Sequence, residues 1–335
     1  MTAQIVLGNT KISASDFPYV IAEAGSNFNQ NLSRAFELID AASKAGANCV
    51  KFQLFRADKL YPNGGDTYEL FKSIELNPDW VPKLAEHSKQ QGLDFTCSCF
   101  DDASFYVLEE VGVNFHKIAS SETTNLQLLY KIARSGKPAL ISTGMCDWVD
   151  IQEAVNVFQH NENEQFALLQ CSALYPLEIG DSNVGVIRNF MSRYNCVVGF
   201  SDHTTGNSAA LAAVGLGGRV FEKHFTLDKT DEGPDHFYAM EPSELKNYIL
   251  AIKEVFTAIG NGDKRLHKEE RENGRRDGLY FSKNLDIGHK IQIGDLKVQR
   301  PSPGLRSRYS ELAIGLQLRN KVKTDQPVFL SDLEF

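Results

Sequence analysis

The chain lacks the marks of several common protein classes. No stretch of apolar residues is long enough to span a membrane, and no basic segment followed by an apolar run stands at the N-terminus. We therefore expect a cytoplasmic protein with no membrane partner. Basic residues are not in excess, because the net charge is −8, and this argues against nucleic acid as a partner.

Glycine loops that bind phosphate are also missing. The pattern G-x-x-x-x-G-K-[S/T] does not occur. The segment Gly215-Leu-Gly-Gly-Arg219 resembles a dinucleotide-binding loop, but an expected helix precedes it and an expected strand follows it. Because a dinucleotide loop needs the reverse order, we interpret this segment as the end of a helix.

Cysteine is sparse and shows no pairing pattern. The six cysteines are at positions 49, 97, 99, 146, 171 and 196. Almost all of them fall within apolar runs of strand length, which predicts buried reduced thiols rather than a disulfide framework. Cys97 and Cys99 form a C-x-C pair with no second pair at zinc-finger spacing, so we do not expect a cysteine-based metal site.

Apolar runs of strand length, bounded by turns, recur along the chain. There are eight of them, at 19–25, 49–55, 94–99, 115–120, 139–143, 166–172, 196–202 and 220–226. Segments with the period of a helix separate them, and the clearest is 32–45, which Gly46 ends. The others are expected at about 80–91, 103–111, 125–135, 149–159, 184–194, 207–217 and 243–259.

Eight strand–helix alternations over roughly 260 residues are typical of the α/β fold called a (β/α)8 or TIM barrel. The rival interpretation is a doubly wound open sheet. Such a sheet usually has fewer strands, and its nucleotide-binding forms carry a glycine fingerprint that is missing here. We therefore expect a barrel domain over residues 1–262.

The composition changes after the barrel. Residues 263–278 are polar and dense in charge, which predicts a linker, and residues 279–335 form short β-like runs such as 279–281, 291–293, 296–299 and 328–330. Residues 264–335 hold 15 Lys+Arg and 10 Asp+Glu, a net of +5 against −13 for the rest of the chain. This small basic module could dock on the barrel, could help hold an anionic ligand, or could simply present a solvated surface.

Polar residues gather where the expected strands end, which is where barrel enzymes place their chemistry. Ser201 and His203 share one face of their strand, and Glu222 and His224 share a face of the next. Two imidazoles brought together at this edge suggest a metal site, although each histidine alone could simply be hydrogen-bonded in a core.

Two lysines stand at the same expected edge. Lys51 and Gln53 alternate on one strand, and Lys117 follows on a later one. A lysine inside a barrel strand must reach an anion or a carboxylate, because an unpaired buried ammonium is costly. The pair therefore indicates anion binding, with internal salt bridges as the alternative. Ser142-Thr-Gly-Met145 follows a strand and adds a weak indication of contact with an oxyanion.

Several stretches together resemble the sialic acid synthase family, whose members condense phosphoenolpyruvate with an N-acylated amino sugar. They are Ile21-Ala-Glu-Ala-Gly25 with Asn27 and Asn29, Ala47-Asn-Cys-Val-Lys-Phe-Gln53, Lys117-Ile-Ala-Ser-Ser-Glu122, Gly136-Lys-Pro with Ile141-Ser-Thr-Gly-Met145, Gly199-Phe-Ser-Asp-His-Thr204, Glu222-Lys-His-Phe-Thr226 and Gly233-Pro-Asp-His236. The resemblance runs from about Tyr19 to the C-terminus. It implies a barrel followed by a small antifreeze-like (SAF) domain, here 279–335. It also implies a domain-swapped homodimer.

The resemblance also implies roles for individual residues. His203 and His224 would bind a divalent metal, with manganese expected ahead of magnesium or cobalt, and Glu23 would lie beside the metal and the sugar aldehyde. The residues that would hold phosphoenolpyruvate are Lys51, Ser98, Lys117, Ser120, Ser142 and Ser201. The residues that would contact the sugar are Gln53, Asn63, Glu122, Tyr175, Asp235 and, from the small domain of the partner chain, Arg300.

The chain departs from the family pattern at a few positions. The segment Asn27-Phe-Asn-Gln30 stands where Asn-His-Asn-Gly is usual, Ser98 replaces a threonine and Ser121 a glycine. Ala173 replaces an asparagine of members that make N-acetylneuraminate. We expect N-acetylmannosamine as the acceptor, with a di-N-acetylated 6-deoxy hexose, which would give a legionaminate- or pseudaminate-like acid, as the alternative. Another metal-dependent barrel aldolase or isomerase, or a carbohydrate-binding protein, would be a different class of function.

Overall fold

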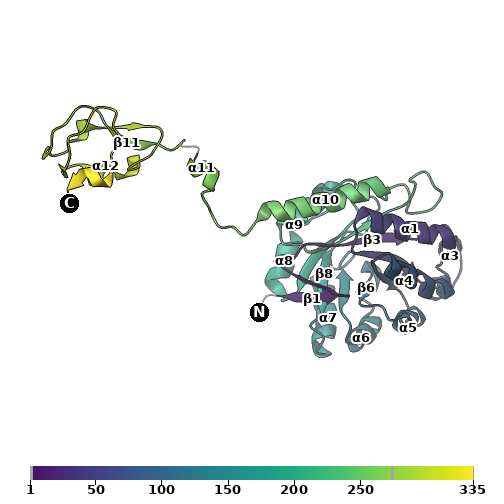
Figure 1. Ribbon diagram of the computed structural model, residues 1–335. Helices are drawn as coiled ribbons and strands as arrows, with labels where there is room; N and C mark the ends of the chain where they lie inside the picture. The colour runs from purple at the N-terminus through teal and green to yellow at the C-terminus, as the bar shows by residue number, and fades with distance from the viewer. Residues whose placement is uncertain (1–2, 273–274, 335) are drawn as a thin grey trace. The chain divides into compact units, whose positions relative to one another are not determined.

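The computed structural model describes residues 3–272 and 275–334, and the chain divides into two units, Met1–Gly260 and Asn261–Phe335. The first unit is a closed barrel of eight parallel strands surrounded by helices (Figure 1). Its strands are β3 (Tyr19–Gly25), β4 (Cys49–Leu54), β5 (Asp94–Cys99), β6 (His116–Ile118), β7 (Ala139–Ser142), β8 (Phe166–Gln170), β9 (Val197–Asp202) and β10 (Val220–His224). Pairing of β10 with β3 closes the barrel, so the predicted (β/α)8 fold is confirmed.

A helix follows each barrel strand. These helices are α1 (Leu32–Ala45), α4 (Val81–Gln90), α5 (Asp102–Val111), α6 (Leu126–Arg134), α7 (Trp148–His160), α8 (Val186–Arg193), α9 (Ser208–Gly215) and α10 (Pro242–Ile259). Local sequence sets their ends. Asn31 caps α1 by accepting from the Arg34 amide, and Gly46 ends it in the left-handed conformation. Asp147 and Asp150 form a capping box at the start of α7.

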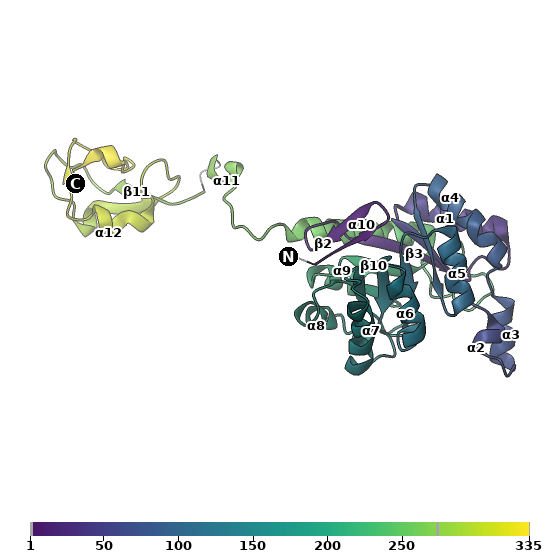
Figure 2. The same ribbon diagram turned by 90° about the horizontal axis from the view of Figure 1, so that it is seen from below.

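Several short elements were not predicted. The connection after β4 contains α2 (Ala57–Leu60), α3 (Asp66–Ser73) and the 3₁₀ turn η1 (Pro78–Trp80); Figure 2 shows α2 and α3 together at one edge of the unit. Strand β6 is shorter than expected, because the chain turns into η2 (Ser120–Glu122) directly after it. Another turn, η3 (Ile179–Asp181), lies between β8 and α8.

The N-terminal segment forms a hairpin that was also missed. It consists of β1 (Gln4–Leu7) and β2 (Thr10–Ser13). Ile5, Leu7 and Ile12 belong to one buried apolar cluster with residues of the barrel strands, among them Tyr19 and Phe115. Tyr19 and Phe115 stand at or next to the N-terminal ends of their strands. The hairpin therefore covers that end of the barrel with apolar side chains and leaves the polar strand ends at the opposite mouth.

The C-terminal unit is a small β-rich module with its own apolar core. Its elements are α11 (Lys268–Glu272), β11 (Gly278–Phe281), η4 (Ile293–Asp295), β12 (Leu296–Gln299), η5 (Ser307–Tyr309), α12 (Ser310–Ala313), β13 (Gln317–Leu318), η6 (Leu330–Asp332) and β14 (Leu333–Glu334). β11 begins at Gly278, inside the predicted linker. The runs 291–293 and 328–330 are not strands, because Asp295 and Asp332 each accept the amide three residues earlier and close a turn.

Two further findings bear on the class of protein. All six cysteines lie within the described residues and carry free thiols, and five of them are buried. Within the part of the chain that the structure describes, no helix combines the length and the hydropathy that crossing a membrane requires.

Candidate active site

Lys51 lies at the centre of a polar cluster inside the barrel mouth. Its Nζ atom is 2.9 Å from Glu23 Oε2 on the neighbouring strand and donates to Ser98 Oγ at 2.7 Å. The strand register explains the first contact, because Glu23 pairs with Lys51 across β3 and β4. Ser98 pairs with Gln53, two residues beyond Lys51, so it lies on the same face as Lys51. All three side chains are buried, so the ammonium is held by charge and hydrogen bonds instead of water.

Glu222 links the two buried lysines and was given no role on sequence grounds. Its Oε1 atom lies 3.4 Å from Lys117 Nζ, and its Oε2 atom lies 3.8 Å from Lys51 Nζ. Burial opposes ionisation of this carboxyl, but Lys117 and Lys51 outweigh that effect and lower its pKa to about 2. Its place two residues before His224, on the same face, was the signal that could have identified it.

The surroundings of Glu23 shift its pKa in the direction opposite to that of Glu222. Gln53 donates to Glu23 Oε1 at 2.9 Å. Burial raises the pKa of Glu23 to about 7. The charge of Lys51 lowers the pKa, but it does not outweigh burial, because the carboxylate of Glu222 acts in the opposite direction. The cluster therefore holds two carboxyl groups whose environments shift their pKa values in opposite directions.

Three more of the serines predicted to hold phosphoenolpyruvate lie at or near the C-terminal ends of β6, β7 and β9, and they contact one another or the backbone. Ser142 and Ser201 are in mutual contact, with their Oγ atoms 2.7 Å apart. Ser120 accepts the amide of Gly144 at 2.9 Å. A Cβ atom at Gly144 would lie 2.8 Å from Ser120 Oγ, so only glycine allows this approach. Lys117 is buried with these groups, and burial lowers its pKa.

The two histidines lie side by side, with ring centroids 5.5 Å apart. His203 Nδ1 lies 2.8 Å from the carbonyl oxygen of Ser172. A carbonyl only accepts, so Nδ1 carries the proton and Nε2 keeps its lone pair. Burial, followed by the neighbouring His224, lowers the pKa of His203 to about 4, so this imidazole is neutral near pH 7.

The donor set fits a divalent metal in part. In the described chain, the buried His224 Nδ1 has no hydrogen-bond partner, although Asp235 Oδ2 lies 3.8 Å away. Neutral imidazoles of fixed tautomer are ordinary metal ligands. No group of three or more His, Cys, Asp or Glu suited to a metal occurs within residues 3–272 and 275–334. The protein side of a metal site here would therefore consist of two histidines.

Comparison with known proteins agrees with this architecture. The model of the NeuB family matches residues 38–264, and the model of the SAF domain matches residues 276–334. The chain belongs to the NeuB family. It is a (β/α)8 barrel followed by a SAF domain, as the resemblance implied.

The NeuB-family relatives include synthases of several nonulosonic acids. An N,N'-diacetyllegionaminic acid synthase of Campylobacter jejuni is 35% identical, over 92% of this chain and 97% of the relative. An N-acetylneuraminate-9-phosphate synthase of Drosophila melanogaster is 32% identical, over 93% and 95%. The crystal structure of an N-acetylneuraminic acid synthetase from Leptospira borgpetersenii is 33% identical, with a TM-score of 0.77 over 82% of this chain and 95% of that one.

Aromatic rings and Asp235 form a wall beside the histidines of this NeuB-family chain. The Tyr175 ring centroid lies 4.1 Å from that of His203. Tyr238, which sequence reasoning missed, packs against Tyr175 and donates to Asp235 Oδ1 at 2.7 Å. Burial, followed by the charge of Asp235, raises the pKa of Tyr238, so its hydroxyl stays protonated.

Three other residues that were predicted to contact the sugar are either bonded outside this cluster or exposed. Glu122 is buried in η2 and accepts from Asn125 at 3.0 Å. Asn63 is exposed in the connection between α2 and α3. Arg300 is exposed and follows β12 in the C-terminal unit.

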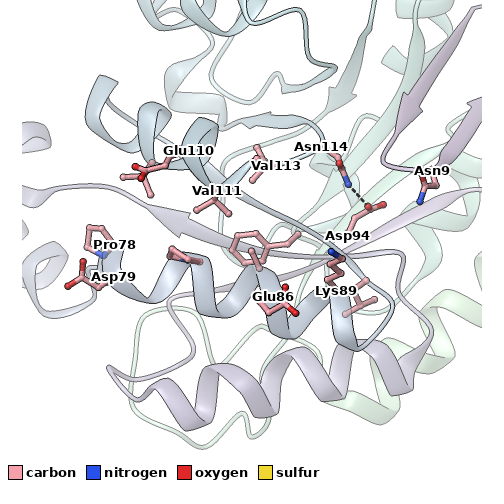
Figure 3. A pocket seen from close by; sticks show the side chains of 16 residues that line it. Asn9, Pro78, Asp79, Glu86, Lys89, Asp94, Glu110, Val111, Val113 and Asn114 are labelled. Carbon is pink, nitrogen blue, oxygen red and sulfur yellow. Dashed lines mark hydrogen bonds between the residues drawn. The ribbon is translucent and has the colours of Figure 1, made fainter.

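The barrel unit also has a cavity away from this polar cluster. It has a volume of about 950 Å³ and runs between α4 and α5 on the outside of the barrel, where Asn114 donates to Asp94 (Figure 3). Of the residues that the structure describes, none of the predicted site set lines it. The side-chain chemistry at the barrel mouth therefore locates the candidate site, and this outer cavity does not.

Proposed function

We propose that this chain is a synthase that condenses phosphoenolpyruvate with an N-acyl amino sugar and water, and releases phosphate and a nonulosonic acid. One observation carries the proposal. Lys51 and Lys117, both buried, share a carboxylate at the same barrel mouth that holds the neighbouring imidazoles of His203 and His224. The site thus combines an anion-binding half with a half suited to a Lewis acid.

The lysine half suits phosphoenolpyruvate, which carries a phosphate and a carboxylate. Ammonium groups and hydroxyls are strong donors to such oxygens. The proposed contacts are Lys51, Ser98, Lys117, Ser120, Ser142 and Ser201. Because the lysines are already fixed by Glu222 and Glu23, they would meet the anion without a large rearrangement.

His203 and His224 would hold a divalent metal, for which we propose manganese. When bound, such an ion supplies Lewis-acid polarisation of a carbonyl oxygen, here the aldehyde of the open-chain sugar. Glu23 and Asp235 flank this position and would orient the aldehyde. The methylene carbon of phosphoenolpyruvate attacks the aldehyde carbon, water adds to the carbon that bears the phosphate, and the phosphate leaves. Lys51 and Lys117 stabilise the charge on the departing phosphate.

The loop after β8, which contains Ala173, is one basis for proposing the acceptor sugar. Ala173 removes a side-chain amide that members making N-acetylneuraminate use, and relatives at 35% and 34% identity are N,N'-diacetyllegionaminic acid synthases. We therefore place a di-N-acetylated 6-deoxy hexose first, ahead of the N-acetylmannosamine expected from sequence. N-acetylmannosamine remains the second candidate, because the Drosophila and Leptospira proteins carry neuraminate in their names.

The sugar would be oriented by residues around the mouth and by a second copy of the chain. The proposed contacts within the barrel are Gln53, Asn63, Glu122, Tyr175 and Asp235. Arg300 would reach the N-acyl group from the SAF domain of a partner chain in a homodimer. This assignment is supported by the opposite net charges of residues 264–335, which are basic, and of the rest of the chain, which is acidic.

The test is phosphate release from phosphoenolpyruvate with manganese and a panel of sugars. The panel contains di-N-acetylated 6-deoxy hexoses, N-acetylmannosamine, and mannose as a control without an N-acyl group. Release with one N-acyl sugar, matched by a nonulosonate of the expected mass, supports the function and names the acceptor. Folded wild-type protein that binds metal but releases no phosphate with any of them would overturn it.

A further inference from the structure

A second polar pair lies behind the two histidines, on the outer face of the barrel wall. Asp202 and Lys223 are direct partners in the register of β9 and β10. Successive side chains on a strand point to opposite faces. Ser201 and Glu222 therefore point into the barrel with His203 and His224, whereas Asp202 and Lys223 point out toward the surrounding helices.

This outer pair is a buried ion pair. The side chains of Asp202 and Lys223 are 0% and 2% exposed, and Lys223 Nζ lies 3.1 Å from Asp202 Oδ2. The ammonium also lies over the ring of Tyr248 on α10, 5.6 Å from its centroid. Helix α10 thus shields the pair from water. Among the described residues, neither side chain of the pair contacts a residue predicted to bind substrate.

The hydrogen bonds of the pair converge on Thr204, the residue after His203. Asp202 Oδ1 accepts the Thr204 amide at 2.8 Å and the Thr204 hydroxyl at 2.7 Å. Lys223 Nζ donates to the Thr204 carbonyl oxygen. Both backbone polar groups of Thr204 are therefore fixed by one ion pair, which also joins β9 to β10.

His203 is held from its other side by the loop after β8. Its carbonyl oxygen accepts the Leu177 amide at 2.8 Å, and its Nδ1 atom is bonded to the Ser172 carbonyl at 2.8 Å. The position of the imidazole thus depends on that loop and on the backbone that the outer pair fixes. His224 directly follows Lys223 at the end of β10, so the same pair also fixes the backbone next to His224.

Stability alone does not account for this arrangement. Burying two charges costs several kcal/mol per ion, and an apolar pair of similar volume is often as stabilising or more so. We propose that Asp202 and Lys223 are positioning residues that set His203 relative to His224. The inference rests on the proposed function, because it takes these histidines as the metal ligands.

Two variants separate positioning from stability. Lys223→Met removes the donor to Thr204 and leaves the Asp202 carboxylate buried without its partner. The double variant Asp202→Leu/Lys223→Met removes both charges and keeps the packing volume. We expect both to bind a divalent metal about 10- to 100-fold more weakly, the usual effect of losing groups that orient metal ligands, although only the single variant leaves an unpaired buried charge.

Arg219 offers a matched control. It is a buried cation directly before β10, at the opposite end from His224, and it donates to the carbonyl oxygens of Ala14 and Gly218 at 3.0 and 2.7 Å. Arg219→Met should also lower the unfolding temperature, because it leaves the buried Gly218 carbonyl oxygen without this donor. It should leave the affinity for metal unchanged.

The measurement is the dissociation constant of manganese, by titration calorimetry on the full chain without substrates, together with the visible absorption spectrum of the cobalt-loaded protein. Weaker binding and an altered cobalt spectrum in both Lys223 variants, but not in Arg219→Met, support the inference. Wild-type affinity in the double variant overturns it and makes the pair merely structural. Wild-type protein that binds no metal would overturn the metal assignment and this inference together.

Discussion

Glu222 Oε1 lies 3.4 Å from the Nζ atom of Lys117, and the other oxygen of the same carboxylate lies 3.8 Å from Lys51 Nζ. One carboxylate therefore balances part of the charge of both lysines. The barrel can thus keep two ammonium groups buried before any anionic substrate arrives. An incoming phosphate or carboxylate would compete with Glu222 for these donors.

Removing Lys117 should weaken phosphoenolpyruvate binding selectively. In Lys117→Met, the anion loses one charged donor, which is worth about 2 kcal/mol for a hydrogen bond to a charged group. We expect the KM for phosphoenolpyruvate to rise at least about tenfold, with little change in the KM for the sugar. Lys137→Met is the control, because Lys137 is a half-buried lysine paired with Glu109 outside the barrel mouth. Equal effects on both substrates would contradict the assignment.

Removing either histidine should abolish condensation and leave the fold intact. His203→Ala and His224→Ala each delete one of the two proposed protein ligands of the metal. We expect turnover to fall by more than about 1,000-fold, while the circular dichroism spectrum stays that of the wild type. His87→Ala removes a histidine that contacts Asp40 on the outer helices and should keep full activity. Near-normal turnover of His203→Ala with added manganese would refute the metal assignment.

Residue 173 should bias the choice of acceptor. Ala173→Asn restores the amide that members making N-acetylneuraminate carry. A single well-placed hydrogen bond favours one substrate by about 1 kcal/mol, so the ratio of kcat/KM should shift about fivefold toward N-acetylmannosamine. Ala173→Val controls for the added volume. If the ratio of kcat/KM values for the two sugars were the same in Ala173→Asn and in the wild type, residue 173 would not determine the choice of acceptor.

Asp295 should make the stability of the SAF domain depend on pH in the acid range. Burial opposes its ionisation, but bonds from Lys283, the Gln292 amide and His289 outweigh that effect and lower its pKa to about 2. The folded pKa lies below the unfolded value of about 3.9. The stabilisation is therefore complete above about pH 4 and is lost as the pH falls toward 2.

Hydrogen exchange of the β11 and β12 amides in the full chain measures this effect. Asp295→Asn should lower the free energy of unfolding of the domain by on the order of 2 kcal/mol at neutral pH and should flatten the acid dependence. Asp286→Asn is the control, because the Asp286–Lys321 pair is exposed on the surface of the same domain. An unchanged acid profile in Asp295→Asn would assign the loss of stability to another carboxyl group.

Local sequence patterns were enough for the eight barrel strands and for the helix that follows each of them. The predicted strand 19–25 and helix 32–45 match β3 and α1 at both ends, because apolar periodicity and terminal caps act within a few residues. The same patterns failed for 291–293 and 328–330. There a side-chain carboxylate closes a turn, and three apolar residues alone cannot distinguish that turn from a strand.

Most of the candidate site could also be located on the strands from sequence, because alternation on a strand places residues two apart on one face. Ser201 and His203, and Glu222 and His224, follow this rule. The same rule places Glu222 on the face of His224, but it could not show that Glu222 links the two lysines. That link depends on the distance from β10 to lysines on β4 and β6, and closure of the barrel sets that distance.

The sequence by itself thus determined the barrel, the small second domain, the family, and the strand ends that carry polar residues, since all of these follow from periodicity, composition and short motifs. Only the tertiary structure decided how the charges are shared. Burial and through-space electrostatics produce three features. Glu222 interacts with two lysines, the pKa values of Glu23 and Glu222 shift in opposite directions, and Asp202 pairs with Lys223 behind the histidines. Those forces act between residues up to about 200 positions apart, and they exist only once the barrel has closed.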